Sequence, residues 1–245
     1  NGYYEWTTPY STPNSLATRN PVALLEQYNA ENHALRSFGN IQVDYKMHFL
    51  PELHANLNLG YDVAKYTGTT KVPSNAAHGY NSIPGLRGQN NQYSNDYTNK
   101  VGEFYLSYNK DIESIRSNIN AVAGTGYYDN YYHNLNYPSI SASNDTIPGS
   151  KPVYPSSFSE VTLESYYGRL IYTFDSKYIL MGSIRTDGSS RFGPQYRWGI
   201  FPSAAFTWKV NHENFLKNSN VFSTLNLRLS DGITLLIHYR KVWHN

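Results

Sequence analysis

The sequence contains no cysteine among its 245 residues, which excludes disulfide bonds and thiolate metal sites. Charged residues make up only 16%, and a formal net charge of +2 provides neither a basic surface for nucleic acid nor an acidic tail. No apolar run reaches the roughly 18 residues that a transmembrane helix needs. The mean hydropathy of -0.57 still permits a transmembrane β-barrel, because only alternate strand residues of a barrel face lipid.

Tyrosine is the abundant residue, with 24 copies against 2 methionines. Aromatic residues favour pleated, half-buried surfaces, so this composition indicates β structure. The chain begins at Asn1 with neither a methionine nor a signal segment. We therefore expect either a mature product or a part of a longer chain.

Hydrophobic residues alternate with polar ones along most of the sequence, which predicts an all-β fold. Between residues 38 and 63 the pattern predicts two strands joined by a tight turn at Pro51. The polar side of this hairpin carries Gln42, Asp44, Lys46, Asn56, Asn58 and Asp62. Similar units recur, and the sequence predicts about eight meander strands of roughly 10–14 residues, longer than is usual in soluble sheets. Helical periodicity is limited to 21–28.

The connections between the predicted strands differ in length. They are short at 50–53, 110–113 and 175–177, and long at 71–97 and 128–163. If successive strands reverse direction, the short turns lie at one end of the sheet and the long loops at the other. Outer-membrane barrels have this arrangement, with short periplasmic turns and long extracellular loops. Two connections fit it less well, those at 187–196 and 210–221.

Aromatic residues recur at a spacing that suits a bilayer. Trp198 and Trp208 share one strand face and lie ten residues apart, roughly 25 Å along a tilted strand. The predicted periplasmic girdle contains Phe49, Tyr108, Phe174, Tyr178 and Trp208. The predicted extracellular girdle contains Tyr61, Tyr127, Tyr166 and Trp198. The alternative interpretation is that these aromatics fill the core of a β-sandwich.

Several segments carry a family resemblance. They include Asn20 to Glu26, the hairpin from Tyr45 to Leu53, and above all a block from Ser165 to Trp208. That block contains Asp175-Ser176-Lys177-Tyr178, Arg185-Thr186-Asp187-Gly188-Ser189-Ser190-Arg191-Phe192-Gly193 and Trp198-Gly199-Ile200-Phe201-Pro202-Ser203. These motifs resemble the Y-DKY turn, the R-DGSSRFG hairpin and the WG-FPS strand of SusC/RagA-type TonB-linked outer membrane proteins.

The resemblance implies a structure larger than this chain. Members of the family form 22-stranded antiparallel transmembrane barrels in the bacterial outer membrane, occluded by an N-terminal plug and driven by TonB. They pair with a SusD-like surface lipoprotein and import oligosaccharides or peptides. Residues 1–245 are therefore expected to be a partial barrel that contacts outer-membrane lipid, without the plug, a TonB box or the C-terminal strands.

The sequence departs from the family pattern near its end. Residues 227–234 resemble the family's LR-SYGITGN, but Asp231 stands where tyrosine is usual. Residues 235–245 match nothing in the pattern and are expected to be a non-family tail. A frameshift or gene-fragment end near Thr234 is the hypothesis that explains both departures.

The motif hairpin is the first candidate site. Arg185, Asp187, Arg191 and Arg197 are expected to form an ion-pair network that fixes the hairpin, and contact with substrate or the lipoprotein is the alternative. Gly188 and Gly193 are expected to be turn residues with positive φ. The motif residues of this site are Arg185, Asp187, Gly188, Ser189, Ser190, Arg191, Phe192, Gly193, Trp198, Gly199, Phe201 and Pro202.

A tyrosine-rich loop at 127–137 is the second candidate. Tyr127, Tyr128, Tyr131 and Tyr132 offer flat apolar faces and hydroxyl groups suited to stacking on sugars or peptides, and self-packing of the loop is the alternative. His48 and His54 could be cross-strand neighbours, but two histidines without a third ligand make a poor zinc site. No catalytic constellation, metal site or cofactor motif is present, so the sequence predicts a protein that is not an enzyme.

Two other architectures remain open. Eight strands can close on themselves, which would give a complete small membrane barrel with a structural or adhesin-like role. A soluble carbohydrate-binding β-sandwich would instead turn the apolar faces inward.

Overall fold

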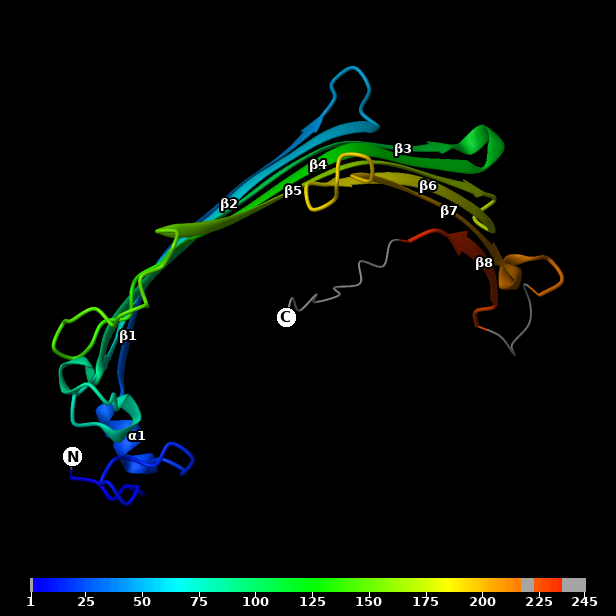
Figure 1. The fold of residues 1–245 in the computed structure, drawn as a ribbon. Helices are drawn as coiled ribbons and strands as arrows, with labels where there is room; N and C mark the ends of the chain where they lie inside the picture. The colour runs from blue at the N-terminus through cyan, green and yellow to red at the C-terminus, as the bar shows by residue number, and fades with distance from the viewer. Residues whose placement is uncertain (1, 217–222, 235–245) are drawn as a thin grey trace. The chain divides into compact units, whose positions relative to one another are not determined.

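The computed structural model describes residues 2–216 and 223–234, and its strands form one antiparallel sheet in the order β1 to β8 (Figure 1). The strands are β1 (Asn29–Lys46), β2 (Leu53–Val72), β3 (Gln89–Ile112), β4 (Ser117–Leu135), β5 (Ser156–Phe174), β6 (Tyr178–Ser189), β7 (Trp198–Lys209) and β8 (Asn226–Gly232). The α-helix α1 (Pro21–Gln27) precedes them. Short 3₁₀ turns lie at η1 (Ala77–Gly79), η2 (Pro84–Leu86), η3 (Glu113–Ile115) and η4 (Val210–His212). No helix within the described residues is long and apolar enough to cross a membrane.

The predicted meander is confirmed, and so is the alternation of short turns with long connections from β1 to β6, but the predicted strand lengths are wrong for β1 to β5. These strands contain 18–24 residues rather than 10–14. Residues 128–135, which the sequence assigned to a loop, continue β4. Backbone pairing continues beyond the apolar stretches because ladder hydrogen bonds do not require apolar side chains. The long connections shrink to 73–88 and 136–155.

The chain divides into two compact units. Unit 1 contains residues 1–38, 62–98 and 131–160, and unit 2 contains 39–61, 99–130 and 161–245. The sheet is open, with β1 and β8 as its edge strands. Neither the closed small barrel nor the two-sheet sandwich therefore describes residues 2–216 and 223–234. The proposed non-family tail at 235–245 lies outside the described residues.

Unit 1 contains a small apolar core. Pro21 occupies the first turn of α1, and the Asn20 side chain accepts hydrogen bonds from the backbone N–H groups of Val22 (3.0 Å) and Ala23 (3.2 Å). Among the residues that the structure describes, the buried hydrophobic ones all belong to this unit: Ala23, Ala64, Val72, Ala76 and Ala77. The two long connections also bond to each other, since the Ala142 N–H donates to the Arg87 carbonyl at 3.0 Å.

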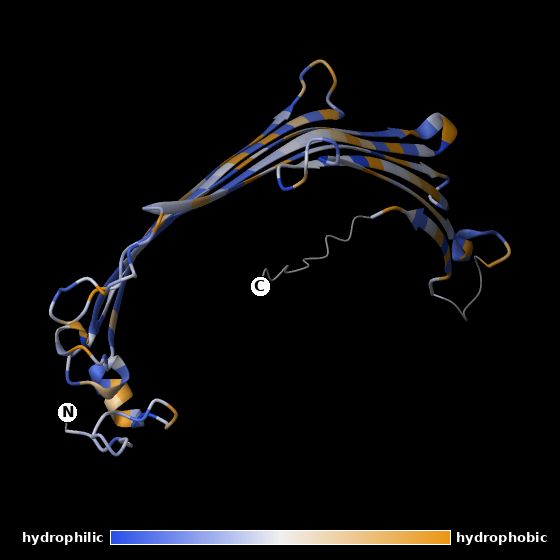
Figure 2. Ribbon diagram, in the orientation of Figure 1, coloured by the Kyte–Doolittle hydropathy of each residue, from blue (hydrophilic) through white to orange (hydrophobic). Residues whose placement is uncertain are grey.

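Unit 2 exposes its large apolar side chains and buries polar ones. The register aligns Leu170 with Gly182 and Ala204 on one face, which we call the apolar face, and Ser183 with Ser203 on the other, the polar face. Figure 2 shows the alternation of hydrophobic and hydrophilic residues along the strands. In the described part of unit 2 the buried side chains are polar, including Asn56 and Ser165 on the polar face, whereas Leu180 and Ile200 on the apolar face are 56% and 64% exposed. A sheet that exposes its apolar face and covers its polar one matches the wall of a transmembrane barrel.

Left-handed residues shape the short turns. Asp175 and Ser176 have φ angles of 52° and 55° between β5 and β6, and Arg116 has φ 48° before β4. Consecutive positive φ values suit a tight hairpin, because the turn then twists in the same sense as its strands. The predicted turn at 175–177 is therefore confirmed.

Candidate functional site

Two rows of stacked rings lie on the apolar face of unit 2. Near the short turns, Tyr178 stacks on Phe174 at 6.2 Å and on Trp208 at 6.4 Å between ring centroids. Toward the other end of the same strands, Tyr166 stacks on Trp198 at 6.0 Å. These rows contain members of both aromatic girdles expected from the sequence, and offset stacking of this kind is favourable.

The predicted role of Gly188 is wrong, because it has no positive φ. It lies inside β6 opposite Trp198, and a Cβ there would meet the indole at 2.9 Å. Glycine is required by the close approach of the indole ring. Gly193 has no positive φ either, and nothing would meet a Cβ at that position within 4 Å.

A hydrogen-bonded cluster lies on the polar face beneath the motif hairpin. Arg185 donates through Nε to Asp187 (2.8 Å to Oδ1), and its Nη2 donates to Ser165 Oγ at 3.1 Å. Ser165, which is 4% exposed, donates to the same Asp187 oxygen at 2.5 Å. The Arg185 guanidinium also lies over the Tyr167 ring, 6.0 Å from its centroid. This cluster ties β5 to β6.

A second cluster continues this polar layer across β2, β3 and β4. Asn58 donates to Glu103 at 3.1 Å, and the Tyr128 hydroxyl donates to the other Glu103 oxygen. Sequence reasoning placed Asn58 on this face but missed Glu103. The available signal was its position directly before Phe104 in an alternating strand, which assigns it to the polar side.

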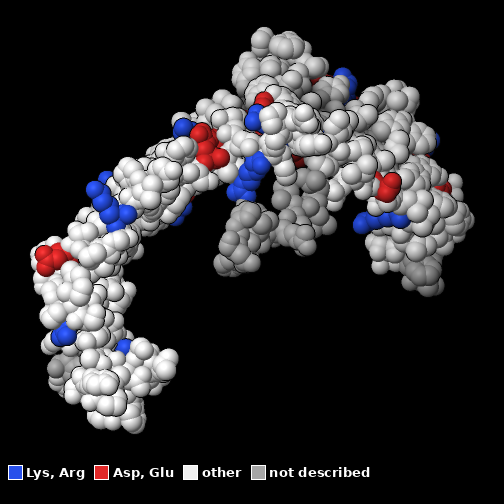
Figure 3. Space-filling view, viewed as in Figure 1, with Lys and Arg blue, Asp and Glu red and all other residues white. Residues whose placement is uncertain are grey.

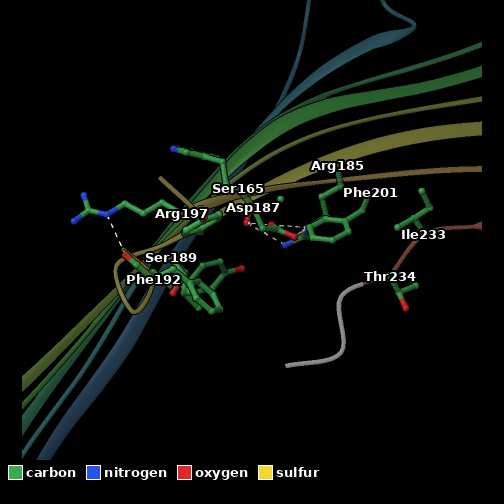
Figure 4. Close-up of a pocket in the computed structure, with 15 residues that line it drawn as sticks. Ser165, Arg185, Asp187, Ser189, Phe192, Arg197, Phe201, Ile233 and Thr234 are labelled. Atoms are coloured by element: carbon green, nitrogen blue, oxygen red, sulfur yellow. Dashed lines mark hydrogen bonds and ion pairs between the residues drawn. The ribbon is translucent and has the colours of Figure 1, made fainter. Parts of the chain in front are cut away.

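Beside these clusters lies a recess of about 630 Å³. Its lining includes Tyr128, Arg185, Asp187, Phe192 and Phe201. Figure 4 shows the Arg185–Asp187 pair beside Phe201. The Arg197 side chain extends away from this pair. Aromatic rings next to a fixed charged pair can stack on a flat ligand and hydrogen-bond its polar groups.

The remaining hairpin residues bind mainly backbone. Arg197 donates from Nε to the Phe192 carbonyl at 3.3 Å, so it does not join the Arg185–Asp187 pair through that nitrogen. The Arg191 N–H donates to Ser189 Oγ at 3.3 Å. Ser190 bridges to β5, where its hydroxyl accepts from the Thr162 N–H at 2.9 Å. Of the expected ion-pair network, the pair of Arg185 and Asp187 is present, and Ser190 and Arg197 tie the loop to backbone groups.

The four candidate tyrosines belong to two different units. All lie in β4 rather than in a loop, and the units divide them into Tyr127 with Tyr128 and Tyr131 with Tyr132. Successive strand residues point to opposite faces, so the members of each pair are separated again. In unit 1, Tyr131 stacks on His133 and Phe158, whereas Tyr132 is 45% exposed.

The two histidines of the first hairpin have different partners. His54 lies 2.8 Å from Asp44 across β1 and β2, whereas His48 lies in the turn, 3.3 Å from the Tyr45 hydroxyl. Among residues 2–216 and 223–234, no three histidine or carboxylate side chains gather in a group that could hold a metal ion.

At the short-turn end, Glu213 joins two turns. It accepts hydrogen bonds from the Tyr178 hydroxyl at 2.6 Å and from Trp208 Nε1 at 3.2 Å, and Lys177 lies 3.4 Å away. The hydrogen bond from Tyr178, and then that from Trp208, lowers the pKa of Glu213. Charge is otherwise sparse, and in Figure 3 the ionic side chains are small groups on a largely uncharged surface.

The fold and the polar layer together define a class: a segment of an antiparallel β-barrel wall, apolar outside and polar inside. No family model matches the chain. It is 36% identical over 230 residues to TonB-dependent receptor SusC of Bacteroides thetaiotaomicron, covering 91% of the chain and 22% of that protein. It is 30% identical over 227 residues to TonB-dependent receptor P39 of Formosa agariphila, covering 89% and 21%.

Solved structures agree at the level of the fold. The RagAB peptide importer in its open-open state matches with a TM-score of 0.71 at 21% identity, covering 94% of this chain and 25% of the other. The RagAB peptide transporter matches with a TM-score of 0.65 at 22% identity, covering 84% and 22%. The chain belongs to the SusC/RagA type of TonB-dependent receptors and corresponds to part of the barrel. It spans about a fifth of the length of its curated relatives, and these relatives carry the names of receptors rather than enzymes.

Proposed function

We propose that this chain forms part of the wall of a TonB-dependent outer-membrane transporter that imports oligosaccharides or peptides. A SusD-like lipoprotein would capture the substrate, and TonB would act through an N-terminal plug outside residues 1–245. The observation that carries the proposal is the inverted burial of unit 2, which exposes Leu180 and Ile200 while it buries Ser165. Similarity to receptor barrels over 91% of the chain supports it.

The polar layer would face the substrate path. The recess beside Arg185 and Asp187 combines a charged pair with Tyr128 and Phe201, and this combination suits hydroxyl-rich or amide-rich ligands. We further propose that Tyr128 and the half-exposed Tyr132 contact substrate at separate points along the path. Tyr127 and Tyr131 would instead serve packing, since Tyr131 already stacks on His133 and Phe158.

A chimaera tests the proposal. Residues 1–234 would replace the corresponding segment of SusC in a strain that lacks its own SusC. The expected result is outer-membrane assembly and restored growth on the nutrient that requires SusC. A chimaera that assembles but takes up nothing, with SusC itself active in parallel, would contradict the transport proposal.

A matched pair of variants makes this test specific to the wall. Leu170→Asp places a carboxylate on the apolar face and should abolish assembly, whereas Ile171→Asp places it on the polar face and should be tolerated. Equal loss in both variants would mean that the two faces are not lipid-facing and lumen-facing.

A further inference from the structure

The polar face of β5 to β8 in unit 2 carries an excess of positive charge. Directly opposed residues of neighbouring strands share a face. The register aligns Arg169 with Ser183 and Ser203, which puts Arg169 on the polar face. Arg228 lies opposite Thr207 on the same face. Lys209 and Arg185 lie on this face by the same criterion. Within the described parts of these four strands, Asp187 is the sole carboxylate that accompanies these four cations.

Three of these four cations have no carboxylate partner in the described chain. Arg185 is paired with Asp187 at 2.8 Å, but Arg169, Lys209 and Arg228 form no ion pair among residues 2–216 and 223–234. Some cations elsewhere are paired, such as Arg36 with Asp62 at 2.8 Å, and others, such as Lys65 and Lys151, are unpaired among the described residues but lie apart in β2 and in a long connection. The three unpaired cations of β5 to β8 instead share one face of neighbouring strands. The unmatched charges therefore mark a surface suited to anions from outside this segment.

The cations follow the strand direction. From the position opposite Arg185 to the position opposite Arg228, β7 advances six residues, from Phe201 to Thr207. At about 3.3 Å per residue this is roughly 20 Å. In the proposed barrel this direction leads from the long connections toward the short turns, which is the direction of import.

Aromatic rings flank the first of these charges. Tyr167 and Phe201 are the residues directly opposite Arg185 on β5 and β7, and the guanidinium lies over the Tyr167 ring. An acidic pyranose ring carries an apolar face and a carboxylate in one unit. Rings would stack on the apolar face, and guanidinium groups bind the carboxylate bidentately.

We infer that Arg169, Arg185, Lys209 and Arg228 form a track that binds the carboxylates of a linear acidic oligosaccharide during import. This inference rests on the proposed function, because it makes the polar face the substrate path. The inference goes beyond the proposed function because it predicts that acidic substrates are preferred to neutral ones.

Binding to the purified chimaera tests the track independently of transport. The probes are a hexamer of galacturonic acid and its fully methyl-esterified, neutral counterpart. We expect the acid to bind about tenfold more tightly at low salt, and expect the preference to disappear at about 0.5 M salt, where charges are screened within a few ångströms. The R169Q/R228Q double variant should lose most of the preference, and R169K/R228K should retain it.

Lys100→Gln is the matched control, because Lys100 lies in β3 and pairs with Asp129 rather than with the track. It should leave the preference unchanged. Equal binding of both hexamers would overturn the inference, as would an unchanged preference in R169Q/R228Q. If that variant instead exposed the plug to protease at unchanged preference, the arginines would bind acidic groups of the receptor itself. Equally tight binding of hexaglutamate would overturn the assignment to oligosaccharides. None of these outcomes depends on uptake.

Discussion

The two units differ in the residues that they bury. Unit 1 buries small apolar residues such as Ala23 and Val72 as well as Ser141, caps its helix with Asn20, and packs its long connections against each other. Unit 2 buries polar side chains such as Ser165 and leaves large apolar ones such as Leu180 exposed. Within the described residues, unit 2 therefore has the burial pattern of a barrel wall that faces lipid with its apolar side.

Different interactions stabilise the two units. In unit 1 they include the helix cap, the small apolar core and the hydrogen bond between the two long connections. In unit 2 they are the backbone ladder, the stacked rings around Tyr178, and the polar network of Ser165, Arg185 and Asp187. Lipid would have to cover the apolar face, since exposed apolar patches of this extent are rare on soluble monomers.

The largest expected effect comes from placing a charge on the apolar face. Leu170 lies between the two ring rows, and Leu170→Lys should destabilise the chimaera in lipid vesicles by about 2–4 kcal/mol. Chemical unfolding in vesicles measures it. Ile171→Lys on the polar face is the control and should change stability by less than about 1 kcal/mol. Similar losses in both variants would contradict the assignment of the faces.

The reverse experiment removes a charge that the chain already carries on the apolar face, that of Asp231. The register aligns Asp231 with Ala204 and Gly182, on the apolar face, where the family pattern has tyrosine. Asp231→Tyr should stabilise the chimaera by about 1–2 kcal/mol, somewhat less than the cost of a lysine at such a position. Vesicle unfolding again gives the value. No gain, with unchanged spectra, would mean that Asp231 does not face lipid.

The helix cap tests unit 1 alone. Asn20→Ala removes the acceptor for Val22 and Ala23 N–H and should cost about 1 kcal/mol of local stability. Amide hydrogen exchange in α1 should accelerate, while amides of β6 keep their protection. Asn20→Asp, which retains a capping oxygen, should restore slow exchange. Equal acceleration in both units would show that they do not unfold separately.

The smallest effect is a pH dependence at the short turns. Hydrogen bonds hold the pKa of Glu213 below its ordinary value, so its folded-state pKa is lower than its unfolded one. Its stabilising contribution is therefore complete above the ordinary pKa and is lost as the pH falls through the lowered one. Stability measured from pH 6 to pH 3 should fall less steeply for Glu213→Gln than for the parent. Parallel curves would contradict this.

Much of the architecture could be predicted from the sequence, because strand alternation and turn residues are local. The meander, the turn at 175–177, the helix at 21–27 and both faces of the first hairpin follow from such patterns. The C-terminal end of β4, residues 128–135, could not be predicted, because its polar residues have the composition of a loop. Gly188 was misassigned because its requirement comes from Trp198 on the next strand, and Glu103 was missed because its partners Asn58 and Tyr128 are far away in sequence.

The central claim is that even-numbered residues of β5 in unit 2 face lipid and odd-numbered ones face the barrel interior. The absence of cysteine permits a clean scan, with single cysteines spin-labelled at positions 166 to 174 of the chimaera in vesicles. We predict that oxygen accessibility, which is high in lipid, peaks at 166, 168, 170, 172 and 174 and falls at the positions between. Uniform accessibility, or peaks at the odd positions, would contradict the account.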